Sequence, residues 1–446
     1  MIPPALSGET HQDSEPFLAV DLQDPQRMVA SAFTPNPFGT TDGTAPVYIT
    51  ADGGETWELN NIVPSAGGLG TSDITVAAST IPKTAYGGIL RVPGDLLLNL
   101  LRAPDFTSPA TMTVLGDRSQ VDQPFIQVKT VGIRDRIYVG NNDLGAPGGR
   151  TATVDVSLDG GATFTPIRIE WRSTGLQNGP SVRPTIANDG TVYVAYFGWR
   201  IFRNSVATSD IVVVRDDQGA AGSNPFQHLT DPSDGQPGRI VAGGVTIPWL
   251  NARALGNERI GSTLSIAVDP NQSGIVYVAW ADRVGNGDIY TIHVRRSVDR
   301  GGTWSNDLRT IRNATCCSVA VAANGTVGLL YQQFVESNGD ARWVVHLEQS
   351  RDGFQTREDR VLANVPGASP TPQFLPYLGD YNFLLSVGNE FRGVFSANNT
   401  PDPGNFPQGV RYQRPVDFRT KRLLDGTGRP VAESIDPFFF KIPVAP

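Results

Sequence analysis

The feature that most constrains the fold is a short turn motif that recurs along the whole chain. The shared pattern is Ser or Thr, then Asp two residues later, then Gly, with an aromatic residue soon after. Its Asp can accept hydrogen bonds from N–H groups of the turn, and its Gly takes backbone angles that other residues resist. Three clear copies and one degraded copy occupy residues 50–57, 157–164, 297–304 and 350–356, with Asp52, Asp159, Asp299 and Asp352 in the turn.

Each turn follows an apolar stretch at a nearly constant distance. Seven such stretches begin at Pro16, Ile74, Pro124, Pro184, Leu264, Ser318 and, less cleanly, Tyr377. The four motif copies follow their stretch by 34 to 36 residues, and weaker turn candidates at Asp105, Asp216 and Asp417 follow at 31, 32 and 40 residues. Runs of β-branched and aromatic residues bounded by Gly, Asn and Asp indicate buried strands. Seven units with one turn each predict an all-β propeller of four-stranded blades, with six blades as the alternative if the seventh unit is misread.

The repeat divides the chain into one propeller domain with two irregular segments. Residues 216–258 are longer than a last strand requires, so we expect an insertion there, and residues 427–446 follow the seventh unit as a closing segment. The expected blades span approximately residues 14–65, 70–118, 119–172, 179–245, 259–314, 315–368 and 372–426.

Composition excludes several classes of function. The net charge is −8 and no run of Lys or Arg occurs, which argues against a nucleic-acid partner. No stretch of eighteen apolar residues predicts a membrane span. The first residues do not have the pattern of a signal peptide, so the compartment stays open: intracellular, or secreted if an export signal has been removed. Four scattered His residues predict no metal site, and we expect no cofactor. Adjacent Cys316 and Cys317 are interpreted as two small buried residues rather than a redox pair.

The turn motif resembles the Asp-box of the sialidase-like (BNR-repeat) propeller superfamily. The resemblance implies that the four turn aspartates are structural and that any functional site lies on the opposite face. Sialidases hold a substrate carboxylate with three arginines, use a tyrosine nucleophile activated by a glutamate, and use an aspartate as acid and base. Their first arginine lies in a Phe/Tyr-Arg-Ile-Pro motif on the first inner strand. Here that strand reads Ser14-Glu15-Pro16-Phe17, and an Arg-Pro pair occurs instead at Arg183-Pro184.

Carried over residue by residue, the resemblance gives a set of catalytic candidates. They are Arg183, Arg259 and Arg283 as the arginines, Tyr377 or Tyr381 as the nucleophile, and Asp122 or Asp282 as the acid. Polar residues that leave the second strands are binding candidates: Asn142, Asp143, Trp199, Arg200, Gln332 and Asn398. Amides, carboxylates, guanidinium groups and aromatic rings together suit sugars.

The sequence therefore predicts a propeller that binds a glycan or glycoconjugate, with sialidase-type exo-glycoside hydrolysis as the catalytic form. The alternative is a non-catalytic scaffold that holds a protein partner on the same face. Asp13, Glu15, Asp73, Gln123 and Asp380 also enter first strands on that face.

Overall fold

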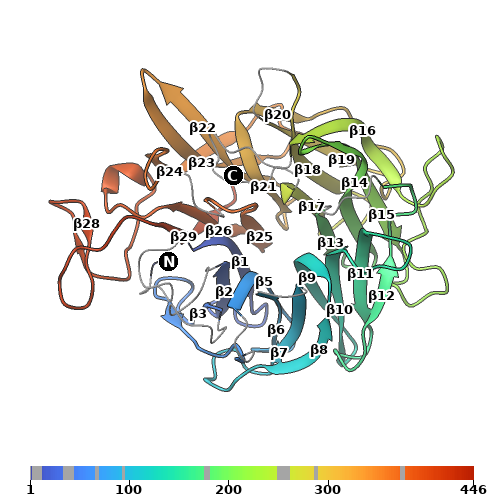
Figure 1. The fold of residues 1–446 in the computed structure, drawn as a ribbon, viewed down its shortest axis with the longest axis horizontal. Coiled ribbons are helices and arrows are strands. Elements are labelled where there is room, and N and C mark those ends of the chain that lie inside the picture. Colours follow the sequence, from blue (N-terminus) through green and yellow to red (C-terminus); the bar gives the residue numbers. More distant parts are fainter. Residues whose placement is uncertain are drawn as a thin grey trace.

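The computed structural model describes residues 2, 13–33, 45–65, 70–92, 96–174, 181–248, 262–285, 290–371 and 377–445. Seven antiparallel sheets surround a central axis (Figure 1). Six have four strands in chain order from the axis outward. Their strands are β1 Ser14–Val20, β2 Met28–Phe33, β3 Val47–Thr50 and β4 Glu58–Leu59; β5 Gly70–Ala78, β6 Ala85–Val92, β7 Leu97–Ala103 and β8 Thr113–Arg118; β9 Val121–Val131, β10 Arg134–Asp143, β11 Thr151–Ser157 and β12 Thr165–Arg168; β13 Val182–Ile186, β14 Val192–Arg203, β15 Val206–Asp216 and β16 Arg239–Pro248; β17 Leu264–Val268, β18 Val276–Asp282, β19 Thr291–Ser297 and β20 Arg309–Arg312; β21 Ala314–Val321, β22 Val327–Ser337, β23 Asp340–Ser350 and β24 Glu358–Pro366.

The seven-bladed prediction is confirmed, and the six-bladed alternative is wrong. Strands such as β18 and β21 are buried along their whole length because each blade packs between two neighbours. Near-continuous apolar runs follow from burial on both faces of a sheet. Among the described residues no helix is long and apolar enough to cross a membrane.

The seventh blade differs from the prediction that residues 372–426 contain its strands. Its described strands are β25 Phe383–Val387, β26 Glu390–Asn398 and β29 Ile435–Pro443, so the closing segment supplies the third strand. Asp417 lies instead in a separate hairpin of β27 Val416–Asp417 and β28 Arg422–Leu423. Residues 399–434, including a short 3-10 helix at Pro403–Asn405, are thus inserted between the second and third strands.

Strand β29 also joins the last blade to the first. The Asp13 N–H donates to the Ile435 carbonyl at 2.7 Å, and the Trp57 and Phe439 ring centroids lie 5.3 Å apart. In the fourth blade, residues 239–248 of the predicted insertion form the outer strand β16, so the described excursion is the loop 217–238.

The four turn aspartates share one hydrogen-bond pattern. In the copy at Asp299, Oδ1 accepts from the Thr303 N–H at 2.8 Å and from the Ser297 hydroxyl at 2.8 Å, and Oδ2 accepts from the Thr303 hydroxyl at 2.7 Å. The same three bonds recur at Asp52, Asp159 and Asp352. These bonds hold the pKa of Asp159 to about 2. Each turn follows a third strand, so all four emerge on the face opposite the first residues of the inner strands.

The inner strands are linked to one another by hydroxyl groups. The Ser265 Oγ accepts from the Val319 N–H at 3.0 Å in the next blade, and the Ser318 Oγ accepts from the Leu384 N–H at 3.0 Å. The Thr75 hydroxyl accepts in the same way from the Ile126 N–H at 3.2 Å. An inner strand has a sheet edge toward the axis, and these side chains satisfy N–H groups that the sheet leaves unpaired. Cys316 and Cys317 are buried on β21, as predicted, and they form no disulfide with each other.

Candidate functional site

Three inner strands begin with the same irregularity. Glu15, Gln123 and Cys316 have positive φ values of 53°, 51° and 53°, and the register of each strand shifts at this point. A bulge inserts one residue into an antiparallel pair and re-aims the side chains around it. Two of the bulges share the sequence pattern Glu/Gln-Pro-Phe, at residues 15–17 and 123–125.

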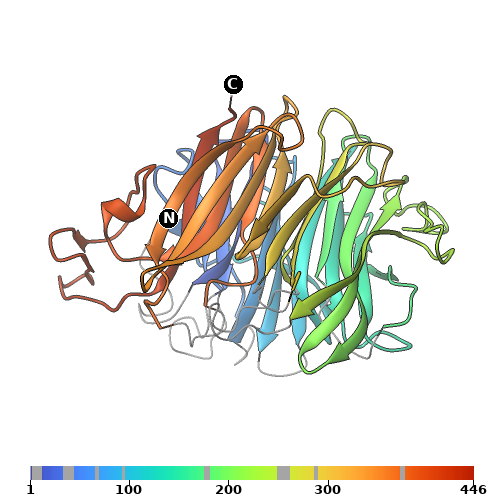
Figure 2. The same cartoon turned by 90° about the horizontal axis from the view of Figure 1, so that it is seen from above.

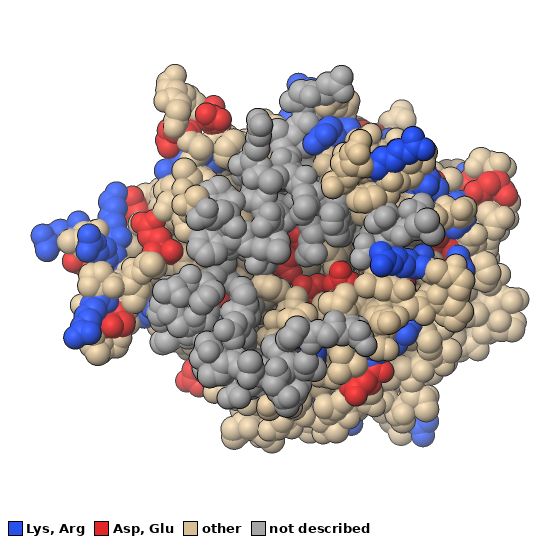
Figure 3. All heavy atoms as spheres, viewed as in Figure 1, with Lys and Arg blue, Asp and Glu red and all other residues tan. Residues whose placement is uncertain are grey.

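Polar side chains from these strand heads meet around the axis. The Glu15 Oε1 accepts from the Asp380 N–H at 3.1 Å, and the Gln123 Nε2 donates to the Asp380 Oδ2 at 3.2 Å and to the Ser262 Oγ. Blades one, three, five and seven are therefore linked by side chains at one point. We call Glu15, Asp73, Gln123, Arg183 and Asp380 the polar cup. Every member is at least 97% buried. Figure 3 shows acidic side chains at the centre of one face of the molecule.

Arg183 forms the base of the cup. Its guanidinium lies 4.8 Å from the centre of the Phe125 ring and 5.3 Å from that of the Tyr381 ring, and its Nη2 donates to the Ser262 carbonyl at 3.3 Å. Burial lowers the pKa of Arg183, and the nearby charges of Asp380, Asp73 and Glu15 oppose that effect. Burial, with Glu15 and Asp73 adding to it, raises the pKa of Tyr381 well above its usual value. Among the described residues, the cup therefore contains three carboxyl groups and one guanidinium group.

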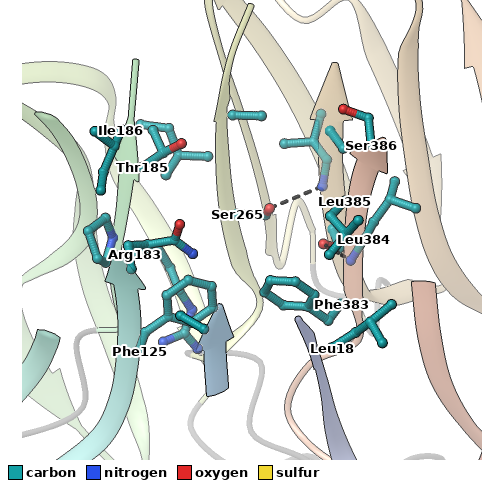
Figure 4. A pocket seen from close by; sticks show the side chains of 18 of the residues that line it. Leu18, Phe125, Arg183, Thr185, Ile186, Ser265, Phe383, Leu384, Leu385 and Ser386 are labelled. Carbon is teal, nitrogen blue, oxygen red and sulfur yellow. Dashed lines mark hydrogen bonds between the residues drawn. The ribbon is translucent and has the colours of Figure 1, made fainter. Parts of the chain in front are cut away.

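Aromatic rings lie beside the cup, next to a channel along the axis. Phe17 contacts Phe125, Tyr381 and Phe383 with ring centroids 5.1 to 5.2 Å apart. The channel contains a cavity of about 340 Å³ that is lined by all seven inner strands, and Arg183 of the cup lines it together with Phe125 and Phe383 (Figure 4). Its lining is largely aliphatic, with Ser265 and Thr185 among its polar members (Figure 4).

Among the predicted catalytic residues that the structure describes, Arg183 and Tyr381 are the two that contact each other. The Asp282 Oδ1 lies 3.1 Å from the His293 Nε2 within the fifth blade, and its Oδ2 accepts from the Trp280 indole N–H at 3.0 Å. The Tyr377 hydroxyl donates to the Gly367 carbonyl at 3.3 Å.

Arg283 and Asp122 do not take part in this contact. Arg283 is half-buried and its backbone N–H donates to the Thr246 carbonyl at 2.8 Å. Asp122 is half-buried beside the cup residue Gln123, whose N–H donates to the Asp122 Oδ1 at 2.9 Å. Arg259 lies outside the described residues.

The predicted binding residues contact other parts of the propeller. Arg200 pairs with Asp210 at 2.6 Å and with Glu170 at 2.9 Å. The other five are buried. Trp199 stacks on Phe202, and Asp143 pairs with Arg118. The Gln332 side chain donates to the Ser396 carbonyl, the Asn398 side chain donates to the Ser369 carbonyl, and Asn142 is fully buried in β10. These contacts give each side chain except Asn142 a partner within the fold.

Sequence reasoning placed the cup acids at the starts of inner strands on the candidate face but assigned none of them as a catalytic or binding residue. Glu15, Asp73, Gln123 and Asp380 are far apart in sequence, and no spacing rule indicates that they meet. The repeated Glu/Gln-Pro-Phe triplet is the one signal that could have found them, because it marks the bulge that opens two inner strands.

Comparison with known proteins found solved structures with a distant similarity in overall fold. A scan against protein-family models found no match, and no curated protein sequence matched. Among solved structures, Sqt1 from Chaetomium thermophilum has a TM-score of 0.41 at 14% identity, covering 90% of this chain and 88% of that one. YCF48 bound to D1 peptide has a TM-score of 0.40 at 11% identity, covering 88% and 90%. The GH93 alpha-L-arabinofuranosidase of Fusarium graminearum with arabinobiose has a TM-score of 0.37 at 13% identity, covering 95% and 92%. These values assign no activity and leave the sialidase-like resemblance unconfirmed, so the fold stands on its own geometry: the chain is a seven-bladed β-propeller.

Proposed function

We propose that this propeller binds a neutral glycan at the polar cup and the surface around it. The observation that carries the proposal is the gathering of three carboxylates and an amide around one buried arginine where the inner strands begin. Carboxylate and amide oxygens accept hydrogen bonds from sugar hydroxyls, and fixed acceptors lose little entropy on binding. Half-buried Asp122 extends the acceptor set toward solvent.

The charge of the cup favours a neutral sugar over a sialic acid. A sialidase-type clamp needs several arginines that face the substrate carboxylate. Here Arg183 is the one cup cation and is already surrounded by Glu15, Asp73 and Asp380. The carboxylate of a sialic acid would be repelled at short range by the excess negative charge of these three residues. Hydrolysis, if the bound glycan is also cleaved, would use a pair of these carboxylates as acid and base.

The test is a glycan array followed by calorimetric titration of any neutral oligosaccharide that binds. Replacing Glu15 or Asp73 by the isosteric amide should weaken that binding about tenfold or more, since a charged acceptor is lost. Glu336→Gln, an exposed change on β22, is the matched control and should leave affinity unchanged.

Two results would contradict the proposal. One is the absence of any neutral glycan that binds, and the other is binding that neither cup substitution weakens. In parallel, fluorogenic neutral glycosides and a fluorogenic sialoside separate the reactions: turnover of the sialoside that Arg183→Ala abolishes would support the sialidase form and refute the charge argument. If no glycan binds at all, the alternative hypothesis of a non-catalytic scaffold that binds a protein partner becomes the better one.

A further inference from the structure

The insertion in the seventh blade carries a concentration of positive charge on an acidic protein. Residues 411–429, which we call the arm, contain six basic and two acidic residues, so the arm has a formal charge of +4. Since the whole chain has −8, the remainder carries −12. The β27–β28 hairpin projects from the edge of the ring (Figures 1 and 2), and Lys and Arg side chains cover that edge in Figure 3.

Five of the six basic residues of the arm are exposed, and the sixth, Arg414, is buried. Arg419, Arg422 and Arg429 are exposed and form no ion pair with any residue that the structure describes. Lys421 pairs with Asp402 at 2.6 Å, with the lysine side chain 58% exposed. Arg411 pairs with Glu55 at 3.2 Å across two exposed side chains, a contact that contributes little.

Both acidic residues of the arm are used by its own turns. The Asp417 carboxylate accepts from the N–H groups of Arg419 and Thr420 at 2.9 and 3.2 Å. The Asp425 Oδ1 accepts from the N–H groups of Thr427 and Arg429 at 2.8 and 2.9 Å. These bonds fix the two tight turns of the arm. The basic side chains are thus presented on an ordered hairpin.

A hollow with both charged and apolar lining residues lies beside the basic side chains. It has a volume of about 300 Å³, and Lys421, Arg422 and Glu433 border it together with apolar walls from Pro401, Leu423, Pro430, Val431 and Ala432. Phe418 on the same hairpin is 48% exposed. An apolar side chain of a partner could enter this hollow while carboxylates beside it meet the guanidinium groups, which bind carboxylates through two parallel hydrogen bonds.

We propose that the arm is a docking site for a short acidic peptide segment that contains aliphatic side chains. The basic surface is short, and the rest of the protein would repel a long polyanion that extended beyond it. Screening limits that repulsion to about 8 Å at physiological salt, so a segment that stays on the arm avoids it. Charge complementarity and the hollow both favour an acidic, aliphatic peptide over a nucleic acid.

The experiment measures fluorescence anisotropy of a labelled peptide of glutamates and leucines with the full-length protein. Wild type should bind it, and binding should weaken several-fold between about 50 and 200 mM salt, as expected for a charge-driven contact. Arg419→Glu with Arg422→Glu should weaken binding about tenfold or more, and the milder pair Arg419→Gln with Arg422→Gln should weaken it less. Arg134→Glu with Arg312→Glu, which reverses two exposed charges on other blades, is the matched control and should leave binding unchanged.

Four results would overturn the proposal. They are no binding by wild type, equal binding by the arm variants and wild type, equal binding of a peptide with glutamine in place of glutamate, and tighter arm-dependent binding of a single-stranded oligonucleotide of equal charge. The last result would assign the arm to nucleic acid. Circular dichroism of each variant confirms that the fold is retained, because all substituted side chains are exposed.

Discussion

Replacing Arg183 tests whether the polar cup is held together by charge. Arg183→Met keeps an unbranched side chain but removes the guanidinium that lies over the rings of Phe125 and Tyr381, and with it the only cup cation. Two cation–π contacts are lost, each worth about 0.5 to 2 kcal/mol depending on how completely it is desolvated. Leaving a buried charge without its partner costs about 3 kcal/mol or more. Together these terms predict a loss of about 4 to 7 kcal/mol in the free energy of unfolding at pH 7.

The pH dependence of this loss is the sharper test. In the variant, three buried carboxylates face one another without a cation, and a proton bound by any of them removes part of that repulsion. A lower pH favours the protonated form, so it stabilises the folded variant relative to wild type. The deficit relative to wild type should hence shrink between pH 7 and pH 5.

Denaturant unfolding followed by tryptophan fluorescence at pH 5, 6, 7 and 8 provides the measurement. Adding Glu15→Gln to Arg183→Met should recover part of the loss at pH 7, because one buried charge is then removed. Arg134→Met, an exposed change on β10, serves as the control. A loss below about 1 kcal/mol at pH 7, or one that is the same at pH 5 and pH 8, would refute the charge-based account of the cup.

Three further predictions concern single side chains. Burial lowers the pKa of His293, but its two aspartate partners raise it overall, so His293→Gln should lower the melting temperature most near pH 6 and progressively less as the pH rises toward 8. Asp299→Ala removes three hydrogen-bond acceptor contacts in a partly exposed turn and should destabilise the fold by about 1 to 2 kcal/mol, measured by denaturant unfolding, whereas no change would show that the turn holds without its carboxylate. Burial raises the pKa of the Cys317 thiol, so a disulfide reagent at pH 8 should label it only after denaturation; rapid labelling of the native protein would contradict its burial.

The sequence was sufficient for the blade count because local chemistry repeats in register with the fold. The Asp turns at Asp52, Asp159, Asp299 and Asp352 follow third strands, and each carries its own hydrogen-bond pattern within seven residues. The seventh unit misled the prediction because Asp417 also forms a tight turn with its own N–H donors. Turn chemistry is local and does not reveal which sheet the flanking residues join.

The site could not be predicted to the same extent. Glu15, Asp73 and Asp380 lie at strand starts that the sequence identifies, but their meeting depends on the closure of the ring, a long-range property. The sialidase resemblance directed attention to Asp282, whose position is explained instead by a cross-strand contact with His293. An aspartate can serve in catalysis, but it can equally well link two strands of one blade through a contact of this kind.

The placement of β29 has a consequence for how the protein is made. The first six blades draw their strands from consecutive stretches of chain, so each can assemble soon after its residues leave the ribosome. The seventh cannot, because its third strand is translated 36 residues after its second. Until residues 435–443 emerge, the nascent ring has an open seam between its first and last sheets, with the edge of β26 uncovered. The ribosome thus delivers an almost complete propeller whose last synthesised strand must enter a gap already formed, and this late step is where premature termination or slow translation would leave an aggregation-prone edge.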